Sequence, residues 1–468
     1  MGKAMKTLSP PVGVAITRKA TLLECLLAAV ASGALLAFAL PPFDVPLLGF
    51  VALAPMIAAV LRASAIPALV STLLTGIMAG TVMTAFLSGI GDGFGSPTLA
   101  LAYFAVFGVA MWFPLMGARV LGAGRAGAIV LGVGALGVLT EWLAARLDYP
   151  FTLALVLWRD APLLWVAGWV GVWGLSFLVW ATNAALALAV MERRLNAPLK
   201  ALAGGLLALH LLGWLQHALI REGETLRVAV VQWEGDYAPL IAQAKAQGAQ
   251  LVVLPEVCCV PEEAVRWAQQ MQVWIIFGAL YWGNAAMLAA PDGTVSEPYL
   301  KMYPFGGENP SWQLGDPVRA FSSPFGTLGA VICYDTMFTE PCRRQALNGA
   351  RLIAVPTFDP YAPGYLLHHL HGATTTLRAA EHHVPLARSE YRAASMIVDA
   401  WGRVPAYAPP EAQLAIADVP LGSGRGTLAS RIGDGYVLLC LLMAIRVGYI
   451  QRGRSETERG CVAQSGGA

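Results

Sequence analysis

Charged residues are scarce in this chain of 468 residues: only 13% are Asp, Glu, Lys or Arg, whereas 57% are hydrophobic. The mean hydropathy is +0.59. Soluble globular domains carry about 25% charged residues, so the composition excludes that class and indicates an integral membrane protein. The formal net charge of +2 gives no indication of a nucleic-acid partner, and we expect none.

Metal and disulfide patterns are missing as well. The sequence contains no CxxC pair and no HExxH motif, so a structural zinc site has no support. Among the seven cysteines, Cys258 and Cys259 are adjacent, and a bond between Cys258 and Cys342 is the one disulfide left open. Five histidines between positions 368 and 383 are interpreted as a polar helix face beside a site. We therefore predict neither a metal nor a cofactor.

Long apolar runs fill both ends of the chain, and a bilayer core needs roughly 20 apolar residues per helix. Seven runs come first, at about 21–40, 47–62, 66–90, 98–118, 126–145, 162–190 and 201–219, and one more follows at 434–450. The prediction is a segment 1–20, a seven-helix transmembrane domain 21–220, a polar domain 221–425, a transmembrane helix 434–450 and a tail 451–468.

Lys and Arg in short loops mark the cytoplasmic side of a membrane protein. Such residues fall on one predicted side, before the first run, in alternate loops and after the last run: Lys3, Lys6, Arg18, Lys19, Arg62, Arg119, Arg125, Arg193, Arg194, Lys200, Arg452, Arg454 and Arg459. The opposite loops contain little beyond Arg146 and Arg159, each near an aspartate. This bias predicts cytoplasmic termini and an extracytoplasmic, periplasmic polar domain.

The polar domain alternates between short apolar strands and helices. Strands are expected near 226–232, 251–254, 273–280, 328–332, 352–355, 385–387, 395–398 and 414–419. Helices are expected near 242–247, 262–271, 339–348 and 366–382. This pattern predicts a layered α/β domain with its functional groups at strand ends.

Three residues at or near such ends supply the parts of a thiol-based active site. Glu256 and Cys333 follow apolar strands, and Lys301 lies between them in the sequence. A thiol that attacks a carbonyl needs a base and a cation that stabilises the oxyanion, so Cys333, Glu256 and Lys301 are predicted as nucleophile, base and electrophilic stabiliser. Each residue alone is more often structural; their order and placement favour catalysis.

Leu254-Pro255-Glu256, Lys301 before Pro304-Phe305-Gly306, and Ile332-Cys333-Tyr334-Asp335 resemble the nitrilase, or carbon-nitrogen hydrolase, superfamily. Seven helices before this domain and one after it resemble its membrane-embedded members, the apolipoprotein N-acyltransferases. The resemblance implies a multi-pass α-helical membrane domain of about eight helices plus an extracytoplasmic αββα sandwich.

The resemblance also implies a reaction at the bacterial inner membrane. Cys333 would take an acyl chain from a phospholipid donor as a thioester and pass it to the α-amine of a diacylglyceryl-cysteine on a lipoprotein acceptor. Membrane lipid would surround the helices. Supporting roles fall to Glu308, Tyr334 and Asp335, and a substrate pocket to Asp359, Tyr361, Arg388 and Glu390, with no metal.

This chain departs from the family pattern at several of these positions. Asp335 stands where the family has Glu, and charged Glu390 and Arg392 stand in a segment that is neutral in the family. Three other readings remain open. These are a membrane-anchored acyltransferase or amidase of the same superfamily with another substrate, such as those encoded with conjugal transfer systems, a catalytically silent scaffold, and a transporter, which the sparse intramembrane charge disfavours.

Overall fold

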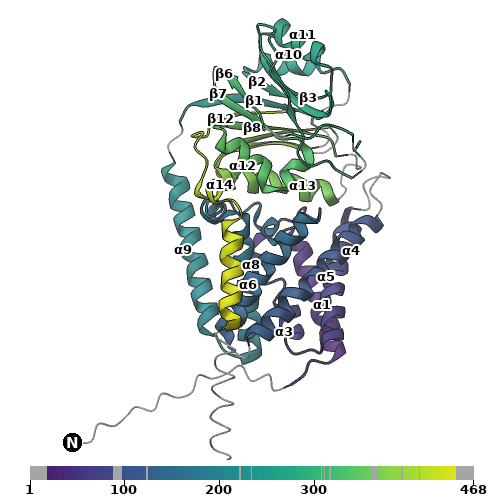
Figure 1. Ribbon diagram of the computed structural model, residues 1–468, viewed down its shortest axis with the longest axis vertical. Helices are drawn as coiled ribbons and strands as arrows, with labels where there is room; N and C mark the ends of the chain where they lie inside the picture. The colour runs from purple at the N-terminus through teal and green to yellow at the C-terminus, as the bar shows by residue number, and fades with distance from the viewer. Residues whose placement is uncertain are drawn as a thin grey trace, which may run out of the picture.

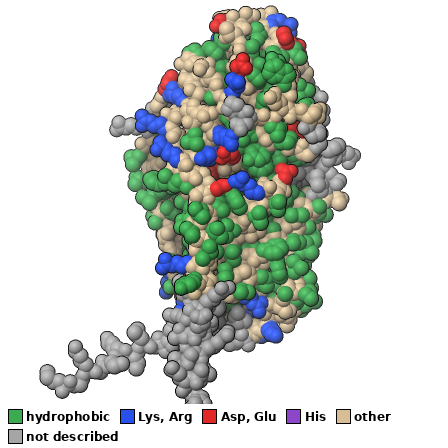
Figure 2. Space-filling model, viewed as in Figure 1, with side chains coloured by type: hydrophobic (Ala, Val, Ile, Leu, Met, Phe, Trp, Pro, Cys, Tyr) green, Lys and Arg blue, Asp and Glu red, His purple; other side chains and the backbone are tan. Residues whose placement is uncertain are grey.

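The computed structural model describes residues 18–87, 97–122, 125–220, 223–232, 235–306, 308–309, 311–315, 318–359, 366–391, 394–409 and 412–449. A helical half and a sheet-rich half are stacked along the longest axis of the molecule (Figure 1). A broad band of hydrophobic side chains covers the helical half, while charged side chains gather on the sheet-rich half and at the opposite tip (Figure 2). The helical half therefore has the surface of a bilayer-embedded domain.

Six described helices are long and apolar enough to cross a membrane: α1 (Leu22–Ala39), α4 (Ala65–Leu87), α5 (Pro97–Gly122), α6 (Ala126–Arg146), α8 (Ala167–Glu192) and α9 (Ala197–Leu219). Shorter apolar helices follow α1 and close the described chain, at Pro46–Val60 and Gly435–Tyr449. The protein is thus a multi-pass membrane protein, as predicted.

Two of the expected spans are interrupted. The run 47–62 forms α2 (Pro46–Gly49) and α3 (Ala54–Val60), each with a proline in its first turn, which starts a helix but cannot continue one. The run 162–190 begins as α7 (Ala161–Leu164), after the 3-10 helix η1 (Leu153–Leu157), and continues as α8. Gly171 inside α8 has φ 68° and ψ 179°, a conformation essentially restricted to glycine, so α8 is kinked there.

The sheet-rich half contains two six-stranded sheets. The first has the order β12-β1-β2-β3-β4-β5, with β1 (Thr225–Val231), β2 (Leu251–Val253), β3 (Trp274–Leu280), β4 (Asn284–Ala289), β5 (Tyr299–Leu300) and β12 (Leu414–Pro420). The second has the order β11-β10-β9-β8-β7-β6, with β6 (Ala320–Ser323), β7 (Gly326–Ala330), β8 (Leu352–Thr357), β9 (Leu386–Glu390), β10 (Ser395–Val398) and β11 (Ala406–Ala408). Strands β4, β5, β6 and β11 were not predicted.

Helices cover both outer faces of the paired sheets. α10 (Ala238–Ala246) and α11 (Pro261–Met271) pack on the first sheet, and α12 (Thr339–Leu347) and α13 (Leu366–His382) pack on the second. Strands of the two sheets contact each other directly, as β1 does with β9 and β3 with β8. The predicted αββα sandwich is confirmed.

The second helix layer joins the sandwich to the membrane domain (Figure 1). α13 and α14 (Leu428–Ile432) pack against α8. The Thr376 hydroxyl donates to the Trp158 carbonyl at 3.0 Å, and the Trp142 indole donates to Asp434 at 2.8 Å. The face of the sandwich that carries α12 and α13 is therefore the one next to the membrane.

Candidate active site

Cys333 begins a one-turn 3-10 helix, η2 (Cys333–Met337), shortly after β7 ends. Its φ of +47° lies in the left-handed region, which few residues other than glycine adopt. The side chain is buried, with 5% of its surface exposed. The chain thus turns sharply at a strand end and holds the thiol in a strained, fixed position.

Asp335 stabilises this turn through hydrogen bonds. Its carboxylate accepts hydrogen bonds from the Ile332 N–H at 3.0 Å and the Tyr299 hydroxyl at 2.7 Å. It also accepts from the N–H groups of Met302 and Tyr303 at 3.0 and 2.8 Å. Burial raises the pKa of Asp335 to about 6, although these hydrogen bonds oppose the shift. Asp335 therefore connects the turn at Cys333 to the segment that follows Lys301.

Lys301 lies between two carboxylates. Its Nζ donates to Glu256 Oε1 at 3.0 Å and also contacts Glu308. Asn284 donates to the same Glu256 oxygen, and the Phe358 N–H donates to the other at 2.8 Å. Lys301 and Glu256 are only 2% and 4% exposed. The structure thus brings together Glu256, Lys301 and Glu308, three of the predicted site residues.

The charges of this group act on each other. Burial lowers the pKa of Lys301, but the negative charges of Glu256, an ionised Cys333 and Glu308 outweigh burial and raise it, so Lys301 is a permanent cation. Burial raises the pKa of Glu308, and Lys301 opposes that shift. A buried cation held in this way is suited to stabilising negative charge that develops nearby.

Carboxylates and one cation, Lys301, affect the pKa of the Cys333 thiol. Burial, followed by the charge of Glu256, raises the pKa of Cys333 well above its ordinary value, while Lys301 lowers it; Asp359 and Glu390 raise it further. Sγ lies 3.7 Å from the Phe358 carbonyl oxygen and 3.8 Å from Asp359 Oδ1. Within the described ranges, Glu256 and Lys301 influence Sγ through charge and not through a direct hydrogen bond. Burial and the surrounding carboxylates thus favour the neutral form of the thiol, and Lys301 opposes them.

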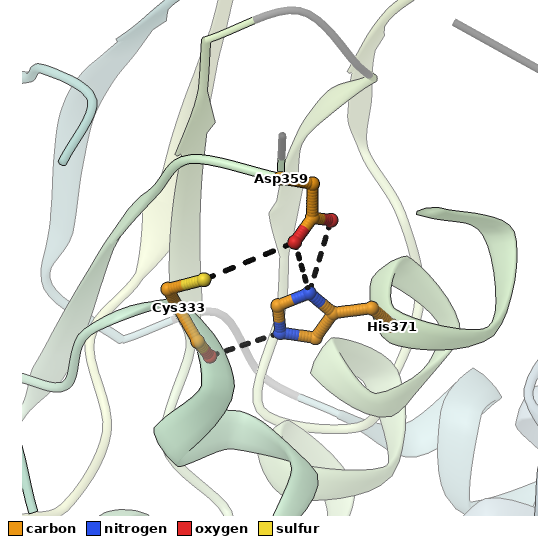
Figure 3. A group of neighbouring side chains, drawn as sticks. All are labelled: Cys333, Asp359 and His371. Carbon is orange, nitrogen blue, oxygen red and sulfur yellow. Dashed lines mark hydrogen bonds and ion pairs between the residues drawn. The ribbon is translucent and has the colours of Figure 1, made fainter. Parts of the chain in front are cut away.

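Asp359 is the centre of a second buried cluster (Figure 3). Its carboxylate lies 2.9 and 3.0 Å from His371 Nδ1, 3.2 Å from His368 Nδ1 and 3.1 Å from Arg388 Nη2. Glu390 accepts from the Asp359 N–H at 3.0 Å and from Arg388 at 2.9 Å. Burial raises the pKa of Asp359, but His371, His368 and Arg388 outweigh burial and hold it well below its usual range.

Donor atoms of Cys333, Asp359 and His371 lie close enough together to bind a metal ion. The Arg388 guanidinium already occupies this corner, since its Nη2 is 3.1 Å from Asp359 and 3.2 Å from His371 Nδ1. A divalent cation would have to bind beside this fixed positive charge, which opposes it at short range. The cluster is better described as a buried ion-pair network next to the thiol.

Other predicted residues have separate positions. Tyr334 contacts the membrane domain, because its hydroxyl is 3.2 Å from Asp148 Oδ1 at the end of α6. Tyr361 lies outside the described residues. A cavity of about 330 Å³ beside η2 is lined by both halves of the molecule, including Trp142, Asp148 and Phe338. The described cysteines are free, so the disulfide between Cys258 and Cys342 is not formed.

The sequence did not single out Asn284, His368 or His371 as site residues. The histidines were interpreted as a polar helix face beside the site. His368 and His371 on α13 are buried next to Asp359 and Cys333. His382, at the other end of α13, contacts Ser430 instead. Asn284 begins a strand that was not predicted. Their spacing from Glu256 and Cys333 follows no period that a sequence pattern would reveal.

Known proteins match both halves of this architecture. Residues 32–185 match the family model of the apolipoprotein N-acyltransferase N-terminal domain, and residues 234–427 match the carbon-nitrogen hydrolase model. The chain belongs to the apolipoprotein N-acyltransferase family. The predicted membership is thereby confirmed, together with the two-part fold.

Individual relatives of the apolipoprotein N-acyltransferase family extend over most of the chain. The apolipoprotein N-acyltransferase of Geobacter metallireducens is 24% identical and covers 89% of this chain and 93% of its own. That of Gloeobacter violaceus is 29% identical and covers 81% and 84%. A solved amidase of the nitrilase superfamily from Nesterenkonia is 23% identical over 43% of this chain and 93% of its own, with a TM-score of 0.37.

Proposed function

We propose that the protein is an apolipoprotein N-acyltransferase. It transfers an acyl chain from a phospholipid, through a thioester on Cys333, to the α-amine of the N-terminal diacylglyceryl-cysteine of a lipoprotein. Family membership supports the reaction, and the buried group of Glu256, Lys301 and Cys333 supports the assignment of roles.

In the first step the Cys333 thiol attacks the ester carbonyl of the phospholipid, and Glu256 takes the thiol proton as a new carbon–sulfur bond forms. Lys301 stabilises the oxyanion of the tetrahedral intermediate. The carbon–oxygen ester bond then breaks, and Glu256 returns its proton to the departing lysophospholipid oxygen. Glu308 holds Lys301 in place, and Asp335 holds the turn that carries Cys333.

In the second step the lipoprotein amine attacks the thioester. A carbon–nitrogen bond forms as Glu256 accepts a proton from the amine. The carbon–sulfur bond then breaks and Glu256 returns the proton to the sulfur, which releases the amide and regenerates the thiol. No oxidant, reductant or cofactor enters the balance. Both steps pass through the same oxyanion site, so loss of Lys301 would slow each of them.

The observation that carries this function is the direct contact between the nucleophile segment and the membrane domain. Tyr334, next to Cys333, reaches Asp148 at the end of α6, and the adjoining cavity is lined by both α6 and α12 residues. A soluble hydrolase has no need for this arrangement. An enzyme whose two substrates are anchored by acyl chains does, because their reacting groups stay near the membrane surface.

We also propose that the catalytic domain faces the periplasm of a bacterial inner membrane, with both termini in the cytoplasm. The basic loops support this orientation. The Arg62 carbonyl accepts from the Ala20 N–H, and Arg119 reaches the Ala63 carbonyl, so these loops meet at one end of the helices. That end is remote from the sheet-rich half, and it is the end that the positive-inside rule assigns to the cytoplasm.

The test is intact-mass spectrometry of the purified protein with a phospholipid, followed by a diacylated lipopeptide. We expect wild type to gain the mass of one acyl chain and to lose it when the lipopeptide becomes acylated. Cys333→Ala should show neither change. The control is Cys259→Ala, which removes a different cysteine and should behave as wild type.

Three other results would contradict the proposed acceptor, nucleophile or donor. An adduct that the lipopeptide leaves untouched would mean another acceptor, as in the superfamily acyltransferases or amidases. An adduct in Cys333→Ala would move the nucleophile to another residue. No adduct with any of several phospholipids would exclude a phospholipid donor.

A further inference from the structure

His371 contacts the backbone of the nucleophile itself. Its Nε2 lies 2.9 Å from the Cys333 carbonyl oxygen and 2.9 Å from the Thr336 hydroxyl, which in turn donates to the same carbonyl at 2.9 Å. A carbonyl oxygen can only accept a hydrogen bond, so Nε2 carries a proton and donates it. The imidazole therefore holds the first peptide of the turn.

The other ring nitrogen is fixed by the opposite partner. Nδ1 lies 2.9 and 3.0 Å from the two oxygens of Asp359, whose low pKa keeps the carboxylate ionised and therefore an acceptor. His371 is thus held at both ring nitrogens, by Asp359 and by the Cys333 carbonyl. Figure 3 shows the ring between these two contacts.

The charged groups around the ring come from β9, from α13 and from the segment after β8, and they support this arrangement. Arg388 on β9 and His368 on α13 both contact Asp359, and Glu390 on β9 accepts from Arg388 and from the Asp359 N–H. Asp359 thus contacts the Arg388 cation and the His368 ring, and its backbone N–H is held by Glu390. Such a fully buried network fixes the orientation of His371 more tightly than a single pair would.

The hydrogen bond from His371 to the Cys333 carbonyl affects the groups that would take part in catalysis. The C=O and N–H of a trans peptide point in opposite directions, so fixing the Cys333 carbonyl also fixes the Tyr334 N–H. It further fixes the ψ angle of Cys333, whose φ is already in the strained left-handed region. The direction of the thiol and of the adjoining peptide group then depends on the imidazole.

We propose that His371 is a positioning residue for the acyl-transfer reaction: its Nε2–H holds the Cys333 carbonyl and so keeps the nucleophile turn in its reactive conformation. This inference rests on the proposed role of Cys333 as nucleophile. It assigns to α13 a contribution to the chemistry beyond its packing between the sandwich and the membrane domain.

Two amide substitutions separate the two contacts of the ring. The side-chain nitrogen of Gln can occupy the place of Nε2, and that of Asn the place of Nδ1. His371→Gln should keep the hold on the carbonyl, and His371→Asn should lose it while keeping a group near Asp359. His369→Gln is the matched control, since that ring is on the same helix and its Nε2 has no hydrogen-bond partner in the described residues.

The measurement is the single-turnover rate of acyl-adduct formation with phospholipid vesicles, with the KM for the phospholipid and the melting temperature of each variant. We expect His371→Asn to slow acylation about tenfold with KM unchanged, from loss of one hydrogen bond in the reactive state. His371→Gln should stay within about threefold of wild type, and His369→Gln should equal it. Thr336→Val, which removes the second donor to the carbonyl, should slow acylation with KM unchanged.

The adduct in wild type tests the proposed function, and the rates of the variants test the positioning role of His371. An absent adduct in wild type contradicts the proposed function. A wild-type adduct with equal rates in His371→Gln and His371→Asn contradicts the positioning role, as does a raised KM with unchanged turnover, which would indicate a binding role. Should His371→Asn fail to fold, His371→Gln decides: acylation slowed by more than about threefold at an unchanged melting temperature overturns the proposal.

Discussion

At the scale of single residues, the proposed active site contains one buried cation between acidic groups. Lys301 contacts both Glu256 and Glu308, and its charge lowers the pKa of the Cys333 thiol. We expect Lys301→Met to slow adduct formation by about 10² to 10³, the usual cost of losing one oxyanion donor, while two carboxylates are left unpaired. Intact-mass kinetics measures this, with the exposed Lys245→Met as control. A wild-type rate in Lys301→Met would remove the cation from the mechanism.

Asp335 allows a prediction about pH. Its pKa is about 6 in the folded protein and 3.8 for an ordinary aspartate, so the folded state binds the proton more tightly. Its contribution to stability therefore rises as the pH falls from 7 to 4. In Asp335→Asn the side chain cannot titrate. Its amide NH2 cannot accept hydrogen bonds from the four donors that contact the carboxylate, so the variant should have a lower melting temperature than wild type. The gap in melting temperature should be wider at pH 5 than at pH 7.5, and a pH-independent gap would contradict the raised pKa.

The site residues predicted from the sequence alone were those whose position in the chain carries a signal. Glu256 and Cys333 follow apolar strands, and the structure does place Glu256, Lys301 and Glu308 in one contact group. The contact of His371 with Cys333 joins residues 38 apart through a helix and a turn, so no local pattern reveals it. Glu390 was predicted as a pocket residue, but its contact with the Asp359 N–H follows only from the pairing of β8 with β9.

At the scale of elements, hydrophobic length predicted most helices and missed their breaks. The run 162–190 has no proline between Pro162 and its end and was predicted as one helix. The kink at Gly171 is stabilised by a residue 210 positions later: the Val172 N–H donates to Glu381 on α13 at 2.9 Å. A catalytic-domain carboxylate thus caps a membrane helix, which no feature of the run itself could show. The unpredicted strands β5 and β11 are too short to show a period.

The cap at Gly171 gives a prediction for this element. A Cβ at Gly171 would lie 3.1 Å from Glu381 Oε1, and the φ of 68° is strained for other residues. Gly171→Ala should cost about 1 to 3 kcal/mol and lower the melting temperature, with the acylation rate of the folded fraction little changed. Gly205→Ala in α9 is the matched control, because nothing lies within 4 Å of its added Cβ, and it should be neutral or stabilising. Equal melting temperatures for the two variants would contradict the strained cap.

At the scale of the whole molecule, the two-part architecture follows from composition, because an apolar run of sufficient length must enter the membrane and a charged segment must not. How the parts meet does not follow from composition. The contacts between the parts join residues from distant segments: α13 packs on α8, Thr376 bonds to Trp158, and Trp142 bonds to Asp434. These contacts bring the segment of Cys333 next to the helical half, where Tyr334 reaches Asp148.

Orientation is the property of the whole molecule that remains to be measured, and it decides which substrates the thiol can reach. The basic loops gather at the end of the helices opposite the sandwich, so green fluorescent protein fused to the C-terminus should fluoresce in the cytoplasm of a bacterial host. Alkaline phosphatase, which folds only after export, should be active when inserted at the turn after Asp292 and inactive at the C-terminus. Arg193 and Arg194 lie in a loop expected on the cytoplasmic side, so a phosphatase inserted there is the matched control and should be inactive. Active phosphatase at the C-terminus would invert the topology and place Cys333 in the cytoplasm, away from any lipoprotein exported before it is acylated.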